Sequence, residues 1–194
     1  MKALIIVDVQ NDFVNGNLAV KDAETIIPEL NRLIDLADSR DDMIIIGTKD
    51  SHPNKHSSFA STHGVEPFTE VKGIGVVWPD HCVEGSEGWR LHPDLKSQRI
   101  SAIVLKGRDK DVDSYSGFKD ANGKLTELDS ILKDNEVNEI FICGLATDYC
   151  VKATAIDGAQ LGYKTHLVKK AHKPVFPDKL DETLIDIALG GVIV

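Results

Sequence analysis

The chain has 194 residues, of which 42% are hydrophobic and 27% are charged, as in an ordinary globular domain. A formal net charge of −9 at pH 7 argues against a nucleic-acid or anionic-membrane partner, since both require basic patches. The three cysteines do not form a disulfide framework, and no apolar stretch reaches the length of a membrane span. We therefore expect a cytoplasmic protein whose residues 1–194 form a single domain.

Short apolar runs, typical of buried strands, alternate along the chain with segments of helical periodicity. The predicted strands, in chain order, are Ala3–Val7, Met43–Gly47, Ala102–Leu105, Ile140–Cys143 and Thr165–Val168, with Val192–Val194 as a candidate sixth. The helical patterns run over residues 26–37, 125–132, 153–161 and 180–188. Strands that alternate with helices pair in parallel. We therefore predict a three-layer α/β/α, Rossmann-like domain with a mainly parallel sheet of about six strands.

Residues 49–98 interrupt this alternation. The segment has little sustained periodicity and holds five of the seven histidines in the chain. A connection of this length is usually functional. Within it, Asp50 and His52 share one face of an extended segment, and His81 can complete a set of two imidazoles and one carboxylate. This set predicts one divalent metal ion, and the spacing of the residues does not choose among zinc, iron and manganese, of which we expect zinc first.

A carboxylate, an ammonium and a thiol each stand just after an apolar run. Asp8 follows the first predicted strand, Lys106 ends another, and Cys150 lies in a small-residue turn where a helix begins. Alone, each has an ordinary structural explanation, such as a loop cap, a solvated lysine or a half-buried thiol. Together they meet at the carboxyl edge of a parallel sheet, where ligands bind in α/β folds. We therefore expect Cys150 to be a nucleophile, Asp8 its proton carrier, and Lys106 a charge that favours the thiolate.

Three aromatic residues adjoin these polar segments and are candidates for a substrate pocket. They are Phe13, Trp78 and Tyr115. Each is also explained by packing in the core or at its rim. We favour the pocket interpretation for Phe13 and Trp78 because a polar motif stands next to each one.

Six segments of the chain resemble the nicotinamidases of the isochorismatase-like cysteine hydrolase superfamily. The matching residues are 6–13 (IVDVQNDF), 48–53 (TKDSHP), 78–82 (WPDHC), 106–107 (KG), 115–118 (YSGF) and 144–151 (GLATDYCV). They follow the order of the family and extend over almost the whole chain. Each segment alone is a weak signal, whereas six in register are specific.

The resemblance implies an amidase that hydrolyses nicotinamide to nicotinate and ammonia, a reaction of NAD salvage. In the family, the residues that correspond to Asp8, Lys106 and Cys150 are catalytic, and those that correspond to Asp50, His52 and His81 bind the metal. The metal binds the pyridine nitrogen while the cysteine forms a thioester. The resemblance also implies an oxyanion hole made by the N–H groups of Ala146 and Cys150, and a cis peptide between Leu145 and Ala146. Whether His56 or Ser58 completes the metal shell, directly or through water, stays open.

Other functions remain to be separated from this one. Another enzyme of the superfamily would act on a different small amide or on isochorismate, although those branches generally lack the metal set. A binding module without catalysis is the alternative from another class. In a third alternative, a metal-bound water attacks the substrate and Cys150 is structural. We expect a small-molecule substrate, and the resemblance leaves a homo-oligomer open.

Overall fold

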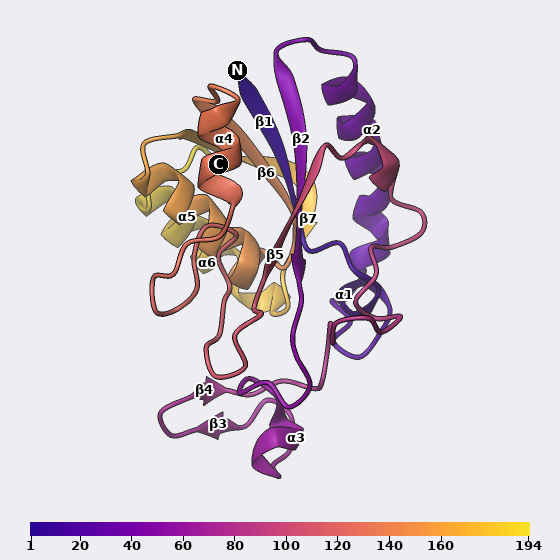
Figure 1. Ribbon diagram of the computed structural model, residues 1–194, viewed down its shortest axis with the longest axis vertical. Helices are drawn as coiled ribbons and strands as arrows, with labels where there is room; N and C mark the ends of the chain where they lie inside the picture. Colours follow the sequence, from indigo (N-terminus) through magenta and orange to yellow (C-terminus); the bar gives the residue numbers. More distant parts are fainter.

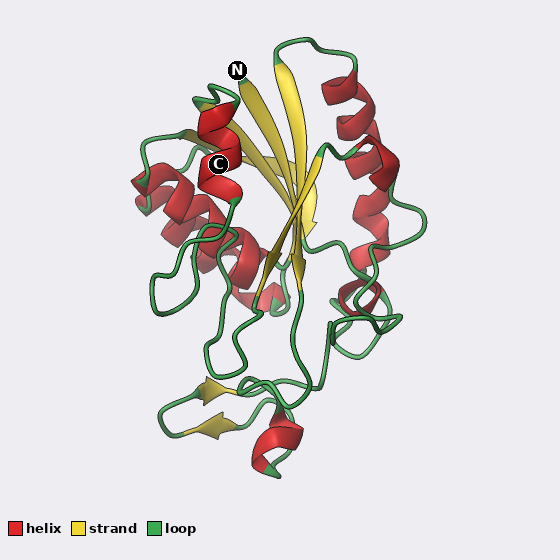
Figure 2. Ribbon diagram, viewed as in Figure 1, coloured by secondary structure: helices red, strands yellow, loops and turns green.

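The computed structural model describes residues 1–194 and is built on one five-stranded parallel sheet in the order β5-β2-β1-β6-β7. The strands are β1 (Lys2–Val7), β2 (Met43–Asp50), β5 (Ala102–Lys106), β6 (Glu139–Leu145) and β7 (Lys164–Lys173). Helices cover both faces of this sheet, as Figures 1 and 2 show. The three-layer α/β/α fold predicted from the alternating pattern is therefore confirmed, with five strands in place of about six.

One long helix lies on one face of the sheet and three helices lie on the other (Figure 1). The long helix is α2 (Ile27–Asp38), and the opposite group consists of α4 (Leu128–Asp134), α5 (Lys152–Gln160) and α6 (Leu180–Leu189). The shorter helices are α1 (Asn11–Val14) and three 3₁₀ turns at Ala23–Ile26, Ser97–Arg99 and Pro177–Lys179. None of these helices has the length and apolar character needed to cross a membrane.

The central strand β1 explains why two cores form. Leu4 and Ile6 face the core that includes α2, whereas Ala3, Ile5 and Val7 face the core that includes α4, α5 and α6. Successive side chains of a strand point to opposite faces, so a run of apolar residues is required when both faces are covered. Each of the four larger side chains is at most 2% exposed and contributes roughly 1.5–3 kcal/mol by its burial.

Two predicted elements differ in the structure. The sixth strand candidate, Val192–Val194, contributes only Ile193, which forms an isolated bridge with His166 beside β7. The helix expected from residue 125 begins at Leu128, because Thr126 Oγ1 accepts the Leu128 N–H and marks the helix start. Leu125 is 63% exposed and lies outside the core.

The irregular segment after β2 extends beyond the carboxyl ends of the strands (Figure 1). It contains α3 (Ala60–His63) and a small antiparallel hairpin, β3 (Glu70–Val71) and β4 (Gly75–Val76). An isolated bridge between Gln10 and Leu91 attaches it to the domain, and another between His52 and Val83 joins two parts of the segment itself. The segment therefore encloses the sheet edge at which ligands bind in parallel α/β folds.

Candidate active site

Asp8 and Lys106 form a buried ion pair at this edge of the sheet. Asp8 directly follows β1 and has a positive φ of 49°, and Lys106 is the last residue of β5. Both side chains are 0% exposed, and Lys106 Nζ lies 2.9 Å from Asp8 Oδ2. Thr48 Oγ1 donates a 2.6 Å hydrogen bond to Asp8 Oδ1 from the neighbouring strand β2. The strand ends thus bring together a carboxylate and an ammonium that are 98 positions apart (106 − 8) in the sequence.

Cys150 completes this group from the other side of the sheet. Strand β6 ends at Leu145, a cis peptide joins Leu145 to Ala146, and one π-helical turn over Thr147–Val151 leads into α5. Cys150 is 6% exposed, and its Sγ lies 3.3 Å from Lys106 Nζ. No hydrogen bond of the Ala146 N–H to another protein group is found. This N–H is therefore free to stabilise an anion beside the thiol.

Burial determines the protonation of the three side chains. Burial raises the pKa of the Cys150 thiol well above its ordinary value, and Lys106 only partly opposes this. Burial likewise raises the pKa of Asp8 despite Lys106. Burial alone would lower the pKa of Lys106, but Asp50 and Asp8 outweigh it and hold the ammonium charged. Lys106 thus lowers the pKa of the thiol and of the Asp8 carboxyl, as its expected role requires, but desolvation is the larger effect and the net shift of each pKa is upward. The thiol needs a base, and a carboxylate oxygen of Asp8 lies within 4.8 Å of its sulfur.

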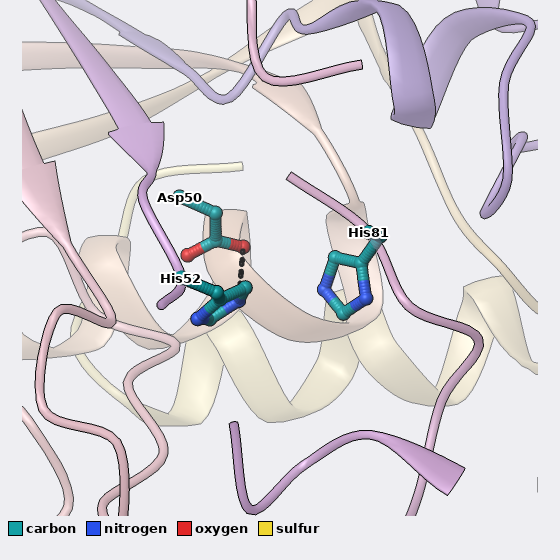
Figure 3. A group of neighbouring side chains, drawn as sticks. All are labelled: Asp50, His52 and His81. Carbon is teal, nitrogen blue, oxygen red and sulfur yellow. Dashed lines mark ion pairs between the residues drawn. The ribbon is translucent and has the colours of Figure 1, made fainter. Parts of the chain in front are cut away.

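Asp50, His52 and His81 point toward one another, as Figure 3 shows, and Asp50 contacts Lys106 of the first group. One ligand atom from each lies within 4.8 Å of the others, and all three residues are buried. Asp50 Oδ2 lies 3.8 Å from His52 Nε2, while Asp50 Oδ1 is 2.5 Å from Lys106 Nζ. The carboxylate therefore faces the lysine with one oxygen and the two imidazoles with the other.

The surroundings of the two imidazoles fit a metal site. His52 Nδ1 is 2.9 Å from the Gly107 oxygen, and His81 Nδ1 is 2.7 Å from the Pro79 oxygen, so both rings keep Nε2 for a ligand. Burial lowers the pKa of both histidines, which favours the neutral form that a metal requires. Gly107 has a φ of +68°, and a Cβ at this position would meet the His52 ring. Two oriented imidazoles and one carboxylate fit zinc, iron or manganese.

His56 and Ser58 lie next to this set but do not belong to it. The His56 ring centroid is 4.3 Å from that of His52. Both of its ring nitrogens have protein partners, because Nδ1 is 2.8 Å from Ser58 Oγ and Nε2 is 3.2 Å from the Val112 oxygen. His56 therefore supports the wall of the site and leaves no ring nitrogen free for an ion.

A single cavity is bordered by both groups of polar residues. Its lining includes Cys150 and the metal set together with the three aromatic residues predicted from the sequence, Phe13, Trp78 and Tyr115. The lining also includes Ser58 and Ala146, both named in the sequence analysis, and five residues that the sequence analysis missed, namely Leu18, Asp113, Ser114, Tyr149 and Val175. Tyr149 packs against Trp78 with ring centroids 4.9 Å apart. Its place next to Cys150 in the sequence was the signal that could have identified it.

Two polar residues near β1 were also missed as supports of the site. Gln10 Oε1 accepts the Asp50 N–H and Gln10 Nε2 donates to the Asp50 carbonyl, both at 2.8 Å. Asp12 Oδ2 accepts the Cys82 N–H at 2.7 Å and so fixes the chain next to His81. Both residues belong to the 6–13 segment, whose polar positions following Asp8 could have suggested this role.

Comparisons with known proteins identify the family of the chain. A family model described as the isochorismatase domain matches residues 2–194. The nicotinamidase of Escherichia coli K12 is 49% identical over 173 residues, which cover 86% of this chain and 80% of that protein. The nicotinamidase/pyrazinamidase of Mycobacterium tuberculosis is 35% identical over 169 residues, which cover 87% of this chain and 84% of that protein.

Solved structures give the same result. The yeast nicotinamidase bound to the inhibitor nicotinaldehyde has a TM-score of 0.91 and 33% identity, with 100% of this chain and 99% of that chain covered. The pyrazinamidase of Pyrococcus horikoshii in complex with zinc has a TM-score of 0.83 and 34% identity, with 99% and 97% covered. The chain therefore belongs to the isochorismatase domain family.

Proposed function

We propose that this protein is an amidase that hydrolyses nicotinamide to nicotinate and ammonia, with Cys150 as the nucleophile. The observation that carries the proposal is the position of Lys106, whose Nζ contacts Asp8, Asp50 and Cys150. One ammonium thus joins the thiol and its base to the metal set, at a cavity that Cys150, Asp50, His52 and His81 all line. The nicotinamidases among the relatives support the choice of substrate.

Asp50, His52 and His81 would hold one divalent ion, and the zinc complex of the Pyrococcus relative supports zinc as the first candidate. When bound, such an ion supplies a ligand position for the pyridine nitrogen and withdraws electron density from the carboxamide. Phe13 and Trp78 enclose the ring, and Tyr115, which also lines the cavity, packs against Tyr149 with centroids 5.5 Å apart. The aromatic walls exclude water from the carboxamide.

The first half of the reaction forms a thioester. The Asp8 carboxylate accepts the proton of the Cys150 thiol, and Sγ attacks the carboxamide carbon while the carbonyl electron pair moves to oxygen. The N–H groups of Ala146 and Cys150 donate to this oxyanion. The carbonyl then re-forms, the C–N bond breaks, and Asp8 returns the proton to the departing nitrogen as ammonia. Lys106 keeps a positive charge beside these changes throughout.

The second half regenerates the thiol. Water attacks the thioester carbon and gives a proton to Asp8, and the C–S bond breaks when the tetrahedral intermediate collapses. Asp8 passes the proton to the Cys150 sulfur, and the acid product leaves. Because burial raises the pKa of the Cys150 thiol, this sequence requires a general base, and Asp8 takes that role in both halves of the reaction.

The test is ammonia release by the purified, metal-loaded protein from a panel of nicotinamide, an aliphatic amide and isochorismate, the last followed by loss of its vinyl ether. We expect turnover of nicotinamide above all others. Zinc, manganese and iron are each supplied in separate assays, so that the wrong metal does not decide the result. The absence of ammonia release from nicotinamide with every metal contradicts the proposal, and turnover of isochorismate alone favours the other branch of the family.

A further inference from the structure

Residues 174–177, which follow β7, form a segment whose backbone N–H groups are both held by one carboxylate. The segment begins and ends with a proline, which has no backbone N–H, so its two donors are those of Val175 and Phe176. Val175 N–H donates to Asp148 Oδ1 and Phe176 N–H donates to Asp148 Oδ2, each at 2.9 Å. Hydrogen bonds to a charged acceptor are stronger than neutral ones. Asp148 therefore fixes the segment at two adjacent points.

Asp148 belongs to the turn that carries the proposed nucleophile. It lies in the π-helical turn Thr147–Val151, two positions before Cys150. Val175 lines the same cavity as Cys150 and packs against the apolar cluster that includes Phe13. Asp148 itself does not line the cavity. One carboxylate thus connects the turn of the thiol to a side chain in the wall of the cavity.

We propose that Asp148 is a positioning residue that holds Val175 in place as a wall of the cavity, and that this wall limits which ring substituents an amide substrate can carry. The inference rests on the amidase activity proposed above. Asp148 acts through Val175, because both of its carboxylate oxygens are occupied by the backbone of residues 175 and 176. A single methyl group that an apolar pocket accepts or rejects changes kcat/KM by roughly 10–200-fold, so a displaced wall is measurable.

The experiment measures kcat/KM for ammonia release from nicotinamide and from its four ring-methyl isomers, with the metal-loaded enzyme. All four isomers are needed because the wall faces only part of the ring. The variants are Val175→Ala, Asp148→Ala, Asp148→Asn and the double variant of Val175→Ala with Asp148→Ala. Asp178→Ala is the matched control, since Asp178 is an exposed carboxylate just beyond the segment and does not hold residues 175 and 176. Melting temperatures are measured for every variant.

We expect Val175→Ala to raise kcat/KM for one methyl isomer, relative to nicotinamide, by about tenfold. Asp148→Ala should favour the same isomer by at least about threefold, because the segment loses both of its hydrogen bonds to the turn. Asp148→Asn keeps one acceptor oxygen and should fall between Asp148→Ala and the wild type. The double variant should show the effect of Val175→Ala alone, because both substitutions act on one wall. Asp178→Ala should keep the wild-type preference.

An isomer preference that is unchanged in Val175→Ala, or in both Asp148 variants, overturns the inference. A gain for a different isomer in Asp148→Ala, or additive effects in the double variant, also overturns it, because Asp148 would then not act through Val175. An equal fall in kcat for every substrate would mean that Asp148 only supports the turn of Cys150. If Asp148→Ala does not fold, Asp148→Asn decides the result. Failure of the wild-type enzyme to release ammonia is a different result, and it overturns the amidase activity itself.

Discussion

The two ends of the sheet each hold a carboxylate beside a lysine, but the two pairs behave in opposite ways. At the carboxyl end, Asp8 and Lys106 are 0% exposed, and burial raises the pKa of Asp8 despite the lysine. At the amino end, Glu139 lies 2.7 Å from Lys164, whose side chain is 62% exposed. Hydrogen bonds from Lys164 and His166 lower the pKa of Glu139 to about 2. The solvent exposure of each pair therefore decides the direction in which the pKa of the carboxyl group shifts.

This difference explains where chemistry is found in the fold. Strands β1 and β6 contribute residues to both ends, with Lys2 and Glu139 at one and Asp8 and the Cys150 turn at the other. At the carboxyl end, which we call the dry end, burial raises the pKa of a carboxyl group and of a thiol that lie close together, Asp8 and Cys150. The exposed amino end holds no such pair. Exposed ion pairs contribute little to stability and do not prepare a nucleophile. Substitutions of matched residues at the two ends test this difference.

The largest expected effect comes from the two lysines. Lys106→Met should destabilise the metal-free protein by about 3–5 kcal/mol, because it leaves buried carboxylates without their counter-charge. Lys164→Met should cause only a small fraction of that loss, since Glu139 retains Lys2 and His166. Urea unfolding at pH 7 measures both variants. Equal losses would show that burial does not distinguish the two ends.

The second-largest expected effect is a difference in metal binding between the two ends of the sheet. Both hold a carboxylate next to an imidazole, Asp50 with His52 and His81 at one end and Glu139 with His166 at the other. Zinc at about 100 times its dissociation constant should stabilise the wild-type protein by roughly 2.7 kcal/mol, and a chelator should suppress ammonia release until zinc or manganese is returned.

The control for this measurement compares the substitution of one histidine at each end of the sheet. His81→Ala should abolish the stabilisation by zinc, whereas His166→Ala should keep it, because the His166 ring stacks on Phe141 with centroids 4.7 Å apart and serves Glu139 alone. Full activity in protein verified to be free of metal would disprove the metal role.

The smallest effect concerns pH at the exposed end. The pKa of Glu139 is lower in the folded protein than its ordinary value of 4.5, so its contribution to stability is complete above pH 4.5 and disappears as the pH falls toward 2. The difference in melting temperature between wild type and Glu139→Gln should therefore be largest near pH 7 and shrink below pH 4.5. A difference that is constant with pH would mean that charge at Glu139 is irrelevant.

The sequence predicted which residues meet at the carboxyl end of the sheet better than the direction of their pKa shifts. Asp8, Lys106 and Cys150 were identifiable because each follows an apolar run, and parallel strands deliver such residues to one edge. Asp50, His52 and His81 were identifiable from residue type and spacing. The direction of the pKa shifts at Asp8 and Cys150 was not identifiable from the sequence. It depends on how completely the 49–98 segment and the aromatic walls exclude water.

The residues that the sequence did not predict are those whose roles arise only from three-dimensional contacts. Ser114 and Val175 come from loops without periodicity, and nothing in their local sequence indicates that they border the cavity. Gln10 acts by binding the backbone of Asp50, a contact across 40 positions. The expected sixth strand is limited to the Ile193 bridge, since an apolar run of three residues does not specify how many of its groups pair.

The central claim, that the buried thiol of Cys150 attacks the amide, is tested most directly by comparing Cys150→Ala with Cys143→Ala. Cys143 is the other free thiol of the β6 segment, is also buried, and does not line the cavity. Ammonia release from nicotinamide is measured for both metal-loaded variants. We predict that Cys150→Ala loses at least about 10⁴-fold in kcat while Cys143→Ala stays near the wild-type rate. A near-normal rate for Cys150→Ala would contradict the account and assign the attack to a metal-bound water.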